Sequence, residues 1–149
     1  MARHLSKRWM TPAGSRPVAD RAHGILLDTS AVIAHLRGRI DVLGLTNPAE
    51  PLFLPLVALG ELYKGAEKSA HSTHNRQLVD DFLQIAALLY PDSATAECYA
   101  KAAVALEAKG QVIPENDLWI AAVALECDMP LATRDAHFQR VDGLTVIPW

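Results

Sequence analysis

Short apolar runs alternate with longer segments of helical period from residue 24 to the end of this 149-residue chain. The runs at residues 25–27, 52–54, 131–133 and 144–147 are mostly apolar, as expected of strands that are buried on both faces. The segments between them carry apolar residues at helical spacing. This alternation predicts an α/β fold with a mainly parallel central sheet and helices on both of its faces.

Local signals predict where the helices begin and end. Asp28, Thr29 and Ser30 are typical of a helix start, and Gly38 is typical of the end of the helix that follows. Asp92 is expected to cap a long helix that Gly110 ends. Helices are expected at residues 31–36, 40–45, 57–69, 73–88, 93–109 and 114–127, with a short additional strand at residues 88–90.

Four acidic residues lie at the junctions of these elements. Asp28 and Asp135 follow strands, Asp117 lies in the first turn of a helix, and Glu61 lies in the helix after the second strand. Ligands of open α/β sheets bind outside the carboxyl ends of the strands, so we expect the four carboxylates to converge there. Oxygen donors, with no His or Cys at ligand spacing, suit Mg²⁺ or Mn²⁺ and disfavour zinc. Without a cation, such a cluster would suppress the ionisation of its own members, so the sequence predicts a metal site.

Each acid also has an ordinary structural explanation. Asp28 and Asp135 can cap helices, Asp117 can complement a helix dipole, and Glu61 can lie on a solvated helix face. These explanations account for the acids one at a time, but not for the four together. Other acids, such as Asp92, are explained fully as caps or exposed helical residues.

Four blocks of the chain resemble the sequence blocks of PIN domains. They are residues 25–33 (ILLDTSAVI), 60–66 (GELYKGA), 116–122 (NDLWIAA) and 131–138 (LATRDAHF). The likeness spans residue 24 to the C-terminus and is greatest to the VapC ribonuclease toxins of bacterial and archaeal toxin–antitoxin pairs. It implies a three-layer α/β/α sandwich, Mg²⁺- or Mn²⁺-dependent cleavage of RNA, a homodimer and inhibition by a small VapB-type antitoxin. It implies no organic cofactor.

The resemblance also implies roles for individual residues. By position, Asp28 and Asp117 would be the principal metal ligands, and Glu61 and Asp135 would complete the catalytic acidic pocket directly or through water. Four polar neighbours are candidates to orient these carboxylates, with helix capping as the alternative role: Thr29, Ser30, Asn116 and Thr133.

Two other classes of function compete with a nuclease. A PIN-like module that binds RNA or a partner without cutting is expected to lack one of the four acids, and none is missing. An aspartyl-phosphate phosphatase built on Asp28 requires a second acid two residues later, where this chain has Ser30. A receiver domain requires paired acids near its first strand and a late lysine, and that pattern is absent. The metal-dependent endoribonuclease is therefore favoured.

Charge is distributed unevenly along the chain. Residues 1–23 contain five basic residues and one acid, a net charge of +4, so the rest of the chain carries −7 of the total of −3. The acidic part would repel RNA unless a cation and local basic residues compensated, and residues 64–76 contain the densest basic group.

Residues 1–23 are predicted to be a flexible basic extension that precedes a nuclease domain at residues 24–149. The extension is rich in Pro, Ser and Gly and lacks the apolar core of a signal peptide. A solvated extension, or a start codon assigned too early with Met10 as the alternative, is the favoured interpretation. An RNA-binding basic arm and a transit peptide remain as alternatives.

The remaining composition indicates a cytoplasmic protein that has no membrane role. No apolar run approaches the roughly 20 residues that cross a bilayer. Cys98 and Cys127 lie in apolar helical contexts and are expected to be reduced core residues.

Overall fold

The structure is a computed structural model that describes residues 9–10, 24–46 and 50–149. Most of the expected basic extension, residues 1–8 and 11–23, lies outside the described residues, and so does the expectation that it is flexible. Within the extension, Trp9–Met10 form the two-residue strand β1.

The centre of the protein is a six-stranded sheet with the order β1-β4-β3-β2-β5-β6. Strands β2 to β6 run parallel to one another, and β1 pairs antiparallel with β4 at one edge. The predicted mainly parallel sheet is therefore confirmed. The strands after β1 are β2 (Ile25–Leu27), β3 (Leu52–Pro55), β4 (Ala86–Leu89), β5 (Leu131–Ala132) and β6 (Val146–Ile147).

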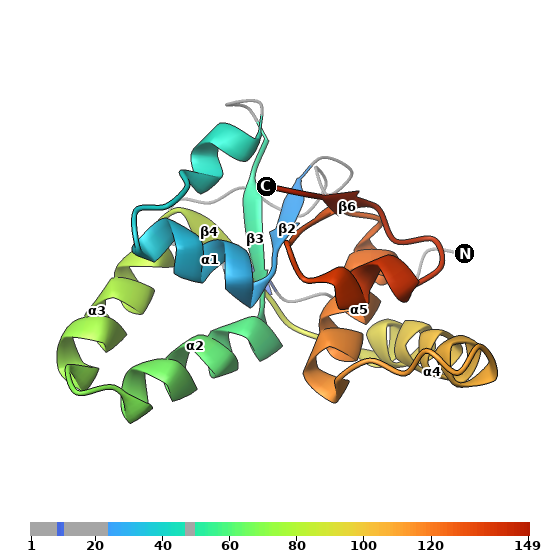
Figure 1. Cartoon of the computed structure of the whole chain (residues 1–149). Helices are drawn as coiled ribbons and strands as arrows, with labels where there is room; N and C mark the ends of the chain where they lie inside the picture. The colour runs from blue at the N-terminus through green and yellow to red at the C-terminus, as the bar shows by residue number, and fades with distance from the viewer. Residues whose placement is uncertain (1–8, 11–23, 47–49) are drawn as a thin grey trace.

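Helices lie on both sides of this sheet. Figure 1 shows α1, α2 and α3 to the left of the central strands β2 and β3, and α4 and α5 to their right, which is the expected three-layer arrangement. The helices are α1 (Thr29–Leu36), α2 (Leu56–Lys68), α3 (Ser72–Phe82), α4 (Ser93–Ala108) and α5 (Glu115–Cys127), with the 3₁₀ helices η2 (Val42–Leu45) and η3 (Ala136–Arg140).

Strand β2 lies at the middle of the core. All three of its residues are buried, because β3 and β5 flank it and helices cover both faces. Gly24 enters this strand past the ring of Phe53, where a Cβ atom would lie 2.5 Å from a ring carbon. A side chain at position 24 would therefore force the Phe53 ring to shift at the start of the strand that leads to Asp28.

The segment after Phe82 differs from the prediction. A helical period was expected to continue to residue 88, but α3 ends at Phe82 and β4 begins at Ala86. The backbone turns between them through hydrogen bonds of the i to i+3 kind, such as Ile85 N to the Phe82 carbonyl at 3.0 Å. Pairing of β4 with β3 along residues 86–89 supplies the hydrogen bonds of a strand, and these outweigh the local helical period.

The glycine helix ends are confirmed. Gly38 after α1 and Gly110 after α4 have φ of 71° and 66°, left-handed values that residues with side chains rarely adopt. Cys98 and Cys127 are both thiols, as expected. Both are half-buried, whereas core positions were expected.

Candidate metal centre

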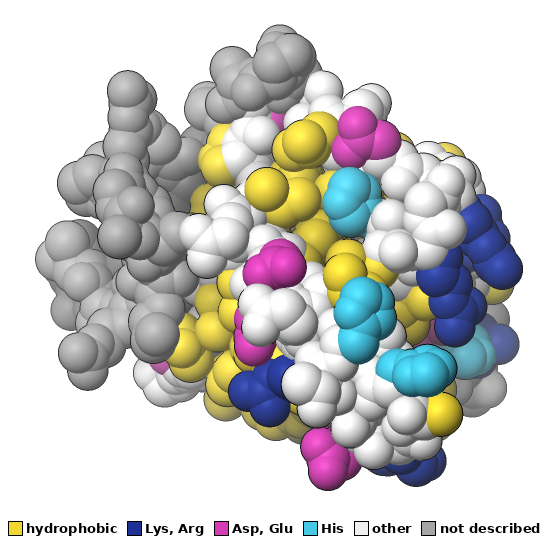
Figure 2. Space-filling view, turned by 90° about the vertical axis from the view of Figure 1, so that its left-hand side faces the viewer, with side chains coloured by type: hydrophobic (Ala, Val, Ile, Leu, Met, Phe, Trp, Pro, Cys, Tyr) yellow, Lys and Arg dark blue, Asp and Glu magenta, His cyan; other side chains and the backbone are white. Residues whose placement is uncertain are grey.

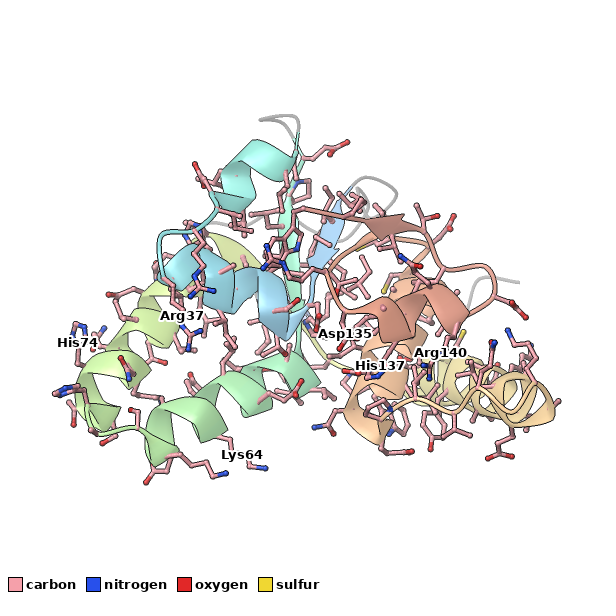
Figure 3. All side chains as sticks on the ribbon, in the orientation of Figure 1. Arg37, Lys64, His74, Asp135, His137 and Arg140 are labelled. Atoms are coloured by element: carbon pink, nitrogen blue, oxygen red, sulfur yellow. The ribbon has the colours of Figure 1, made fainter. Side chains whose placement is uncertain are left out.

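The acidic side chains gather at the carboxyl edge of the sheet, where β2 and β5 end. These strands are parallel neighbours in which Leu27 pairs with Ala132, so Asp28 and Thr133 follow at the same level. Figure 3 shows Asp135 and His137 close together at the lower end of the central strands. The fold thus brings together residues that are more than a hundred positions apart in the sequence.

Asp28 is a buried carboxylate that is 4% exposed, and both of its oxygens accept hydrogen bonds. Its Oδ1 accepts from the backbone N–H of Thr29 at 2.7 Å, which makes Asp28 the N-cap of α1. Its Oδ2 accepts from the hydroxyls of Ser30 at 2.9 Å and Thr133 at 2.6 Å. The capping role and the site role are therefore compatible, because three donors fix the carboxylate in one orientation.

Thr133 connects two of the acids. Its hydroxyl donates to Asp28 and accepts from the backbone N–H of Asp135 at 3.0 Å, and the residue is 1% exposed. On the other side, the Thr29 hydroxyl donates to Glu61 Oε1 at 2.9 Å and so links α1 to α2. Asn116, in contrast, is exposed, and within the described residues it makes no hydrogen bond to any of the four acids.

A histidine completes the cluster. The Nδ1 atom of His137 lies 3.2 Å from Asp117 Oδ2 and 3.1 Å from Asp135 Oδ1. Donor atoms of these three residues all lie within 4.8 Å of one another, close enough to share one metal ion. Sequence reasoning missed His137 because it looked for spacings typical of zinc sites. The signal that could have revealed His137 is its place two residues after Asp135. The turn there brings the two side chains into contact.

Asp28 and Glu61 lie outside this group of three donor residues, but their charges act on Asp117. The pKa of Asp117 is raised, chiefly because burial disfavours its charged form, and also by the negative charges of Asp135, Asp28 and Glu61. The hydrogen bond with His137 acts in the opposite direction. A divalent cation would favour the ionised form of this carboxyl, and the oxygen-rich donor set fits a hard cation.

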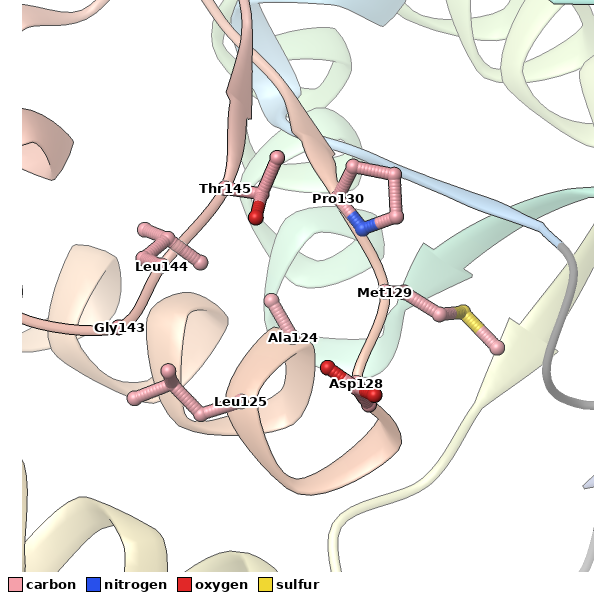
Figure 4. A pocket seen from close by; sticks show the side chains of 8 residues that line it. All are labelled: Ala124, Leu125, Asp128, Met129, Pro130, Gly143, Leu144 and Thr145. Carbon is pink, nitrogen blue, oxygen red and sulfur yellow. The ribbon is translucent and has the colours of Figure 1, made fainter.

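Two cavities among the described residues lie away from this cluster. Figure 4 shows a pocket of about 110 Å³ between the end of α5 and the segments that enter β5 and β6, lined by residues such as Asp128, Pro130 and Thr145. It lies at the amino end of the sheet, opposite to the acids. A second cavity of about 240 Å³, lined largely by apolar side chains of α4, contains none of the acids either. The acidic cluster is therefore identified by its donor atoms, and not by either of these two pockets.

Comparison with known proteins decides the family. A family model described as PIN domain matches residues 25–144. The chain belongs to the PIN-domain family. Among PIN-domain relatives, Ribonuclease VapC2 of Haemophilus influenzae is 31% identical over 127 residues, which are 83% of this chain and 96% of that protein.

Solved PIN-domain structures have the same fold. One such structure is VapBC2 from Rickettsia felis bound to a DNA fragment from its promoter. It has a TM-score of 0.79 at 25% identity, over 84% of this chain and 98% of that one. VapBC-1 from nontypeable Haemophilus influenzae has a TM-score of 0.76 at 28% identity, over 84% and 97%. The expected PIN fold and the likeness to VapC ribonucleases are confirmed. PIN-domain VapC nucleases are metal-dependent, in keeping with the acidic cluster. No helix in the described part of the chain could span a membrane.

Proposed function

We propose that this PIN-domain protein is a metal-dependent endoribonuclease and the toxin of a VapBC-type pair. The observation that carries the proposal is the group of Asp117, Asp135 and His137 at the carboxyl edge of a PIN-domain sheet, with Asp28 and Glu61 near enough to raise the pKa of Asp117. Relatives named ribonuclease VapC and neighbours that are VapBC complexes support RNA as the substrate and a small VapB-like antitoxin as the partner. A homodimer in the cytoplasm belongs to the same proposal.

In this proposal the four carboxylates hold Mg²⁺ or Mn²⁺, with Asp28 and Asp117 as principal ligands. The bound cation would neutralise charge on the phosphodiester and acidify the attacking water. The protein contributes orientation. Thr29, Ser30 and Thr133 hold Asp28 and Glu61 in place through hydrogen bonds of 2.6–2.9 Å, and Thr133 also fixes the backbone at Asp135.

Exposed basic side chains near the acids are proposed to contact the RNA phosphates. Arg134 precedes Asp135, is exposed, and holds its guanidinium over the Trp149 ring at 3.9 Å. Lys64 lies one turn after Glu61 on α2 (Figure 3). Figure 2, viewed from the α3 side, shows Lys and Arg side chains gathered mainly at the right-hand margin, with His beside them. Arg76 serves the fold, because it lies over Tyr63 at 3.8 Å and pairs with Asp80 at 3.5 Å.

Cleavage assays with and without a chelator test the proposed function. The purified protein is expected to cleave RNA in Mg²⁺ or Mn²⁺, to stop when EDTA is added in excess, and to recover when Mn²⁺ is restored, because cleavage needs the cation. Cleavage that continues in excess EDTA would refute the metal mechanism. Intact RNA at full metal occupancy would favour the module that binds RNA without cutting it.

Thr133→Val is expected to weaken metal binding about 10- to 100-fold, the usual effect of losing a partner that orients a ligand. The change keeps the shape of the side chain but removes the hydroxyl that orients Asp28. Calorimetric titration with Mn²⁺ measures the effect without an activity assay. Thr133→Ser should restore affinity, and Thr145→Val is the matched control because Thr145 lines the pocket at the opposite edge. Equal affinities of wild type and Thr133→Val would show that this hydroxyl only supports the fold.

A further inference from the structure

We propose that His137 is a metal ligand through Nδ1, so that the centre of this chain is a mixed nitrogen and oxygen site rather than a set of carboxylates alone. The proposal rests on the proposed function, because it concerns the same cation. It adds a neutral donor to the acidic set and predicts which cations the centre prefers.

The donor separations match those of ligands on a shared ion. Two donor atoms about 2.1 Å from a cation and at right angles lie about 3.0 Å apart, and two on opposite sides lie about 4.2 Å apart. The Nδ1 atom of His137 lies 3.1 Å from Asp135 and 3.2 Å from Asp117, and all three donors are within 4.8 Å of one another. The two Nδ1 contacts have the spacing of neighbouring ligands of one octahedral ion.

The backbone holds the imidazole in this position. Asp135 caps η3 by accepting from the backbone N–H of His137 at 3.0 Å, and Phe138 is fully buried in the core. The anchored ring of Phe138 fixes the backbone of η3, so the Cα of His137 cannot move away without unpacking its neighbour. The side chain is 38% exposed and stays accessible to an ion that enters from solvent.

A tight ion pair explains the contacts less well. A charge-assisted hydrogen bond from an imidazolium to a carboxylate is about 2.7–2.9 Å long. Both contacts of Nδ1 are longer and nearly equal, as in a weak N–H shared between two acceptors or in three donor atoms around one ion. Equal distances to two oxygens are expected when all three atoms face a common point. In the ion-pair interpretation, a cation would displace the imidazole.

A nitrogen ligand has a consequence for metal choice. Carboxylates and water suit Mg²⁺ and Mn²⁺ alike, whereas imidazole binds transition metals in preference to Mg²⁺. The centre should therefore prefer Mn²⁺ over Mg²⁺, and the loss of His137 should reduce that preference. A carboxylate at the same place would favour both cations.

Pulsed electron paramagnetic resonance of the Mn²⁺-loaded full chain tests the proposal. We expect the wild type to show modulation from a directly bound ¹⁴N nucleus. His74→Gln, a matched control at an exposed position of α3, should keep this modulation. His137→Gln should lose it. Titration should show about tenfold weaker Mn²⁺ binding in His137→Gln, with a smaller change for Mg²⁺.

The outcomes separate this proposal from the proposed function. Mn²⁺ bound by the wild type without ¹⁴N modulation would overturn the role of His137 and leave the carboxylate centre intact. A wild type that binds no Mn²⁺ would overturn both. The wild-type spectrum decides the matter even if His137→Gln fails to fold, and His137→Asp provides a second variant, which should keep Mn²⁺ bound but lose the modulation.

Discussion

Asp28→Asn is expected to lower the rate of RNA cleavage at least tenfold, equivalent to about 1.4 kcal/mol in the activation barrier. The change keeps the shape of a buried side chain but removes a negative charge that the cation requires. Asp117→Asn should have an effect of the same size for the same reason. Initial rates at saturating Mn²⁺ measure both effects, and circular dichroism should show that the fold is retained.

Asp92→Asn is the matched control for this pair. Asp92 caps α4, with its carboxylate accepting from the Thr95 backbone N–H at 3.1 Å, and Asn is an equally good N-cap. Its cleavage rate should therefore be unchanged. A loss at Asp92 as large as that at Asp28 would show that the site is assigned to the wrong carboxylates.

Asp117→Asn is also expected to raise the melting temperature of the metal-free protein at neutral pH. Burial and the neighbouring carboxylates raise the pKa of Asp117 above its ordinary value of 3.8 in the folded chain. A raised carboxyl pKa means that the folded state is penalised for ionising this group, so stability falls as the pH rises through the raised pKa. At neutral pH the penalty is fully present, and Asn removes it. Melts in EDTA should show an advantage for the variant that shrinks as the pH falls through the raised pKa and is lost below the ordinary value of 3.8.

Mn²⁺ should reverse this order. A ligand at a hundred times its Kd stabilises the folded state by about 2.7 kcal/mol, which corresponds to a rise of roughly 5–10 °C in the melting temperature of a domain of this size. The wild type should gain this stability, and Asp117→Asn should lose most of the gain. Equal wild-type midpoints with and without saturating Mn²⁺ would mean that the acids do not share an ion.

The sequence predicted those parts of the fold that depend on local chemistry. Asp28 both ends a buried strand and starts a helix, and Gly38 and Gly110 adopt the positive φ values expected of them. The segment that follows Phe82 could not be assigned locally, because Leu88 and Leu89 fit a helical period as well as a strand. Only pairing with β3, which is distant in sequence, decides between them.

The candidate site was predictable to a similar degree. The positions of the four acids followed from the edge of a parallel sheet, whereas side-chain direction required the three-dimensional structure. Asn116 and Asp117 are adjacent on α5, yet only Asp117 turns toward His137 while Asn116 is exposed. His137 joins Asp117 across twenty residues through the turn at Asp135, and no spacing rule for the sequence encodes that turn.

The hydrogen bond from Thr133 to Asp28 joins residues that are 105 positions apart. A ribosome that adds 5–20 residues per second needs roughly 5–20 s to make the chain between them. Until β5 has been synthesised and has paired with β2, Asp28 lacks one of its three hydrogen-bond donors, and Asp117 lacks Asp135 and His137. Each newly made copy therefore passes through an interval in which its first helices can already form but the proposed metal centre does not yet exist. The order of synthesis delays that centre until β5 and η3 have been made.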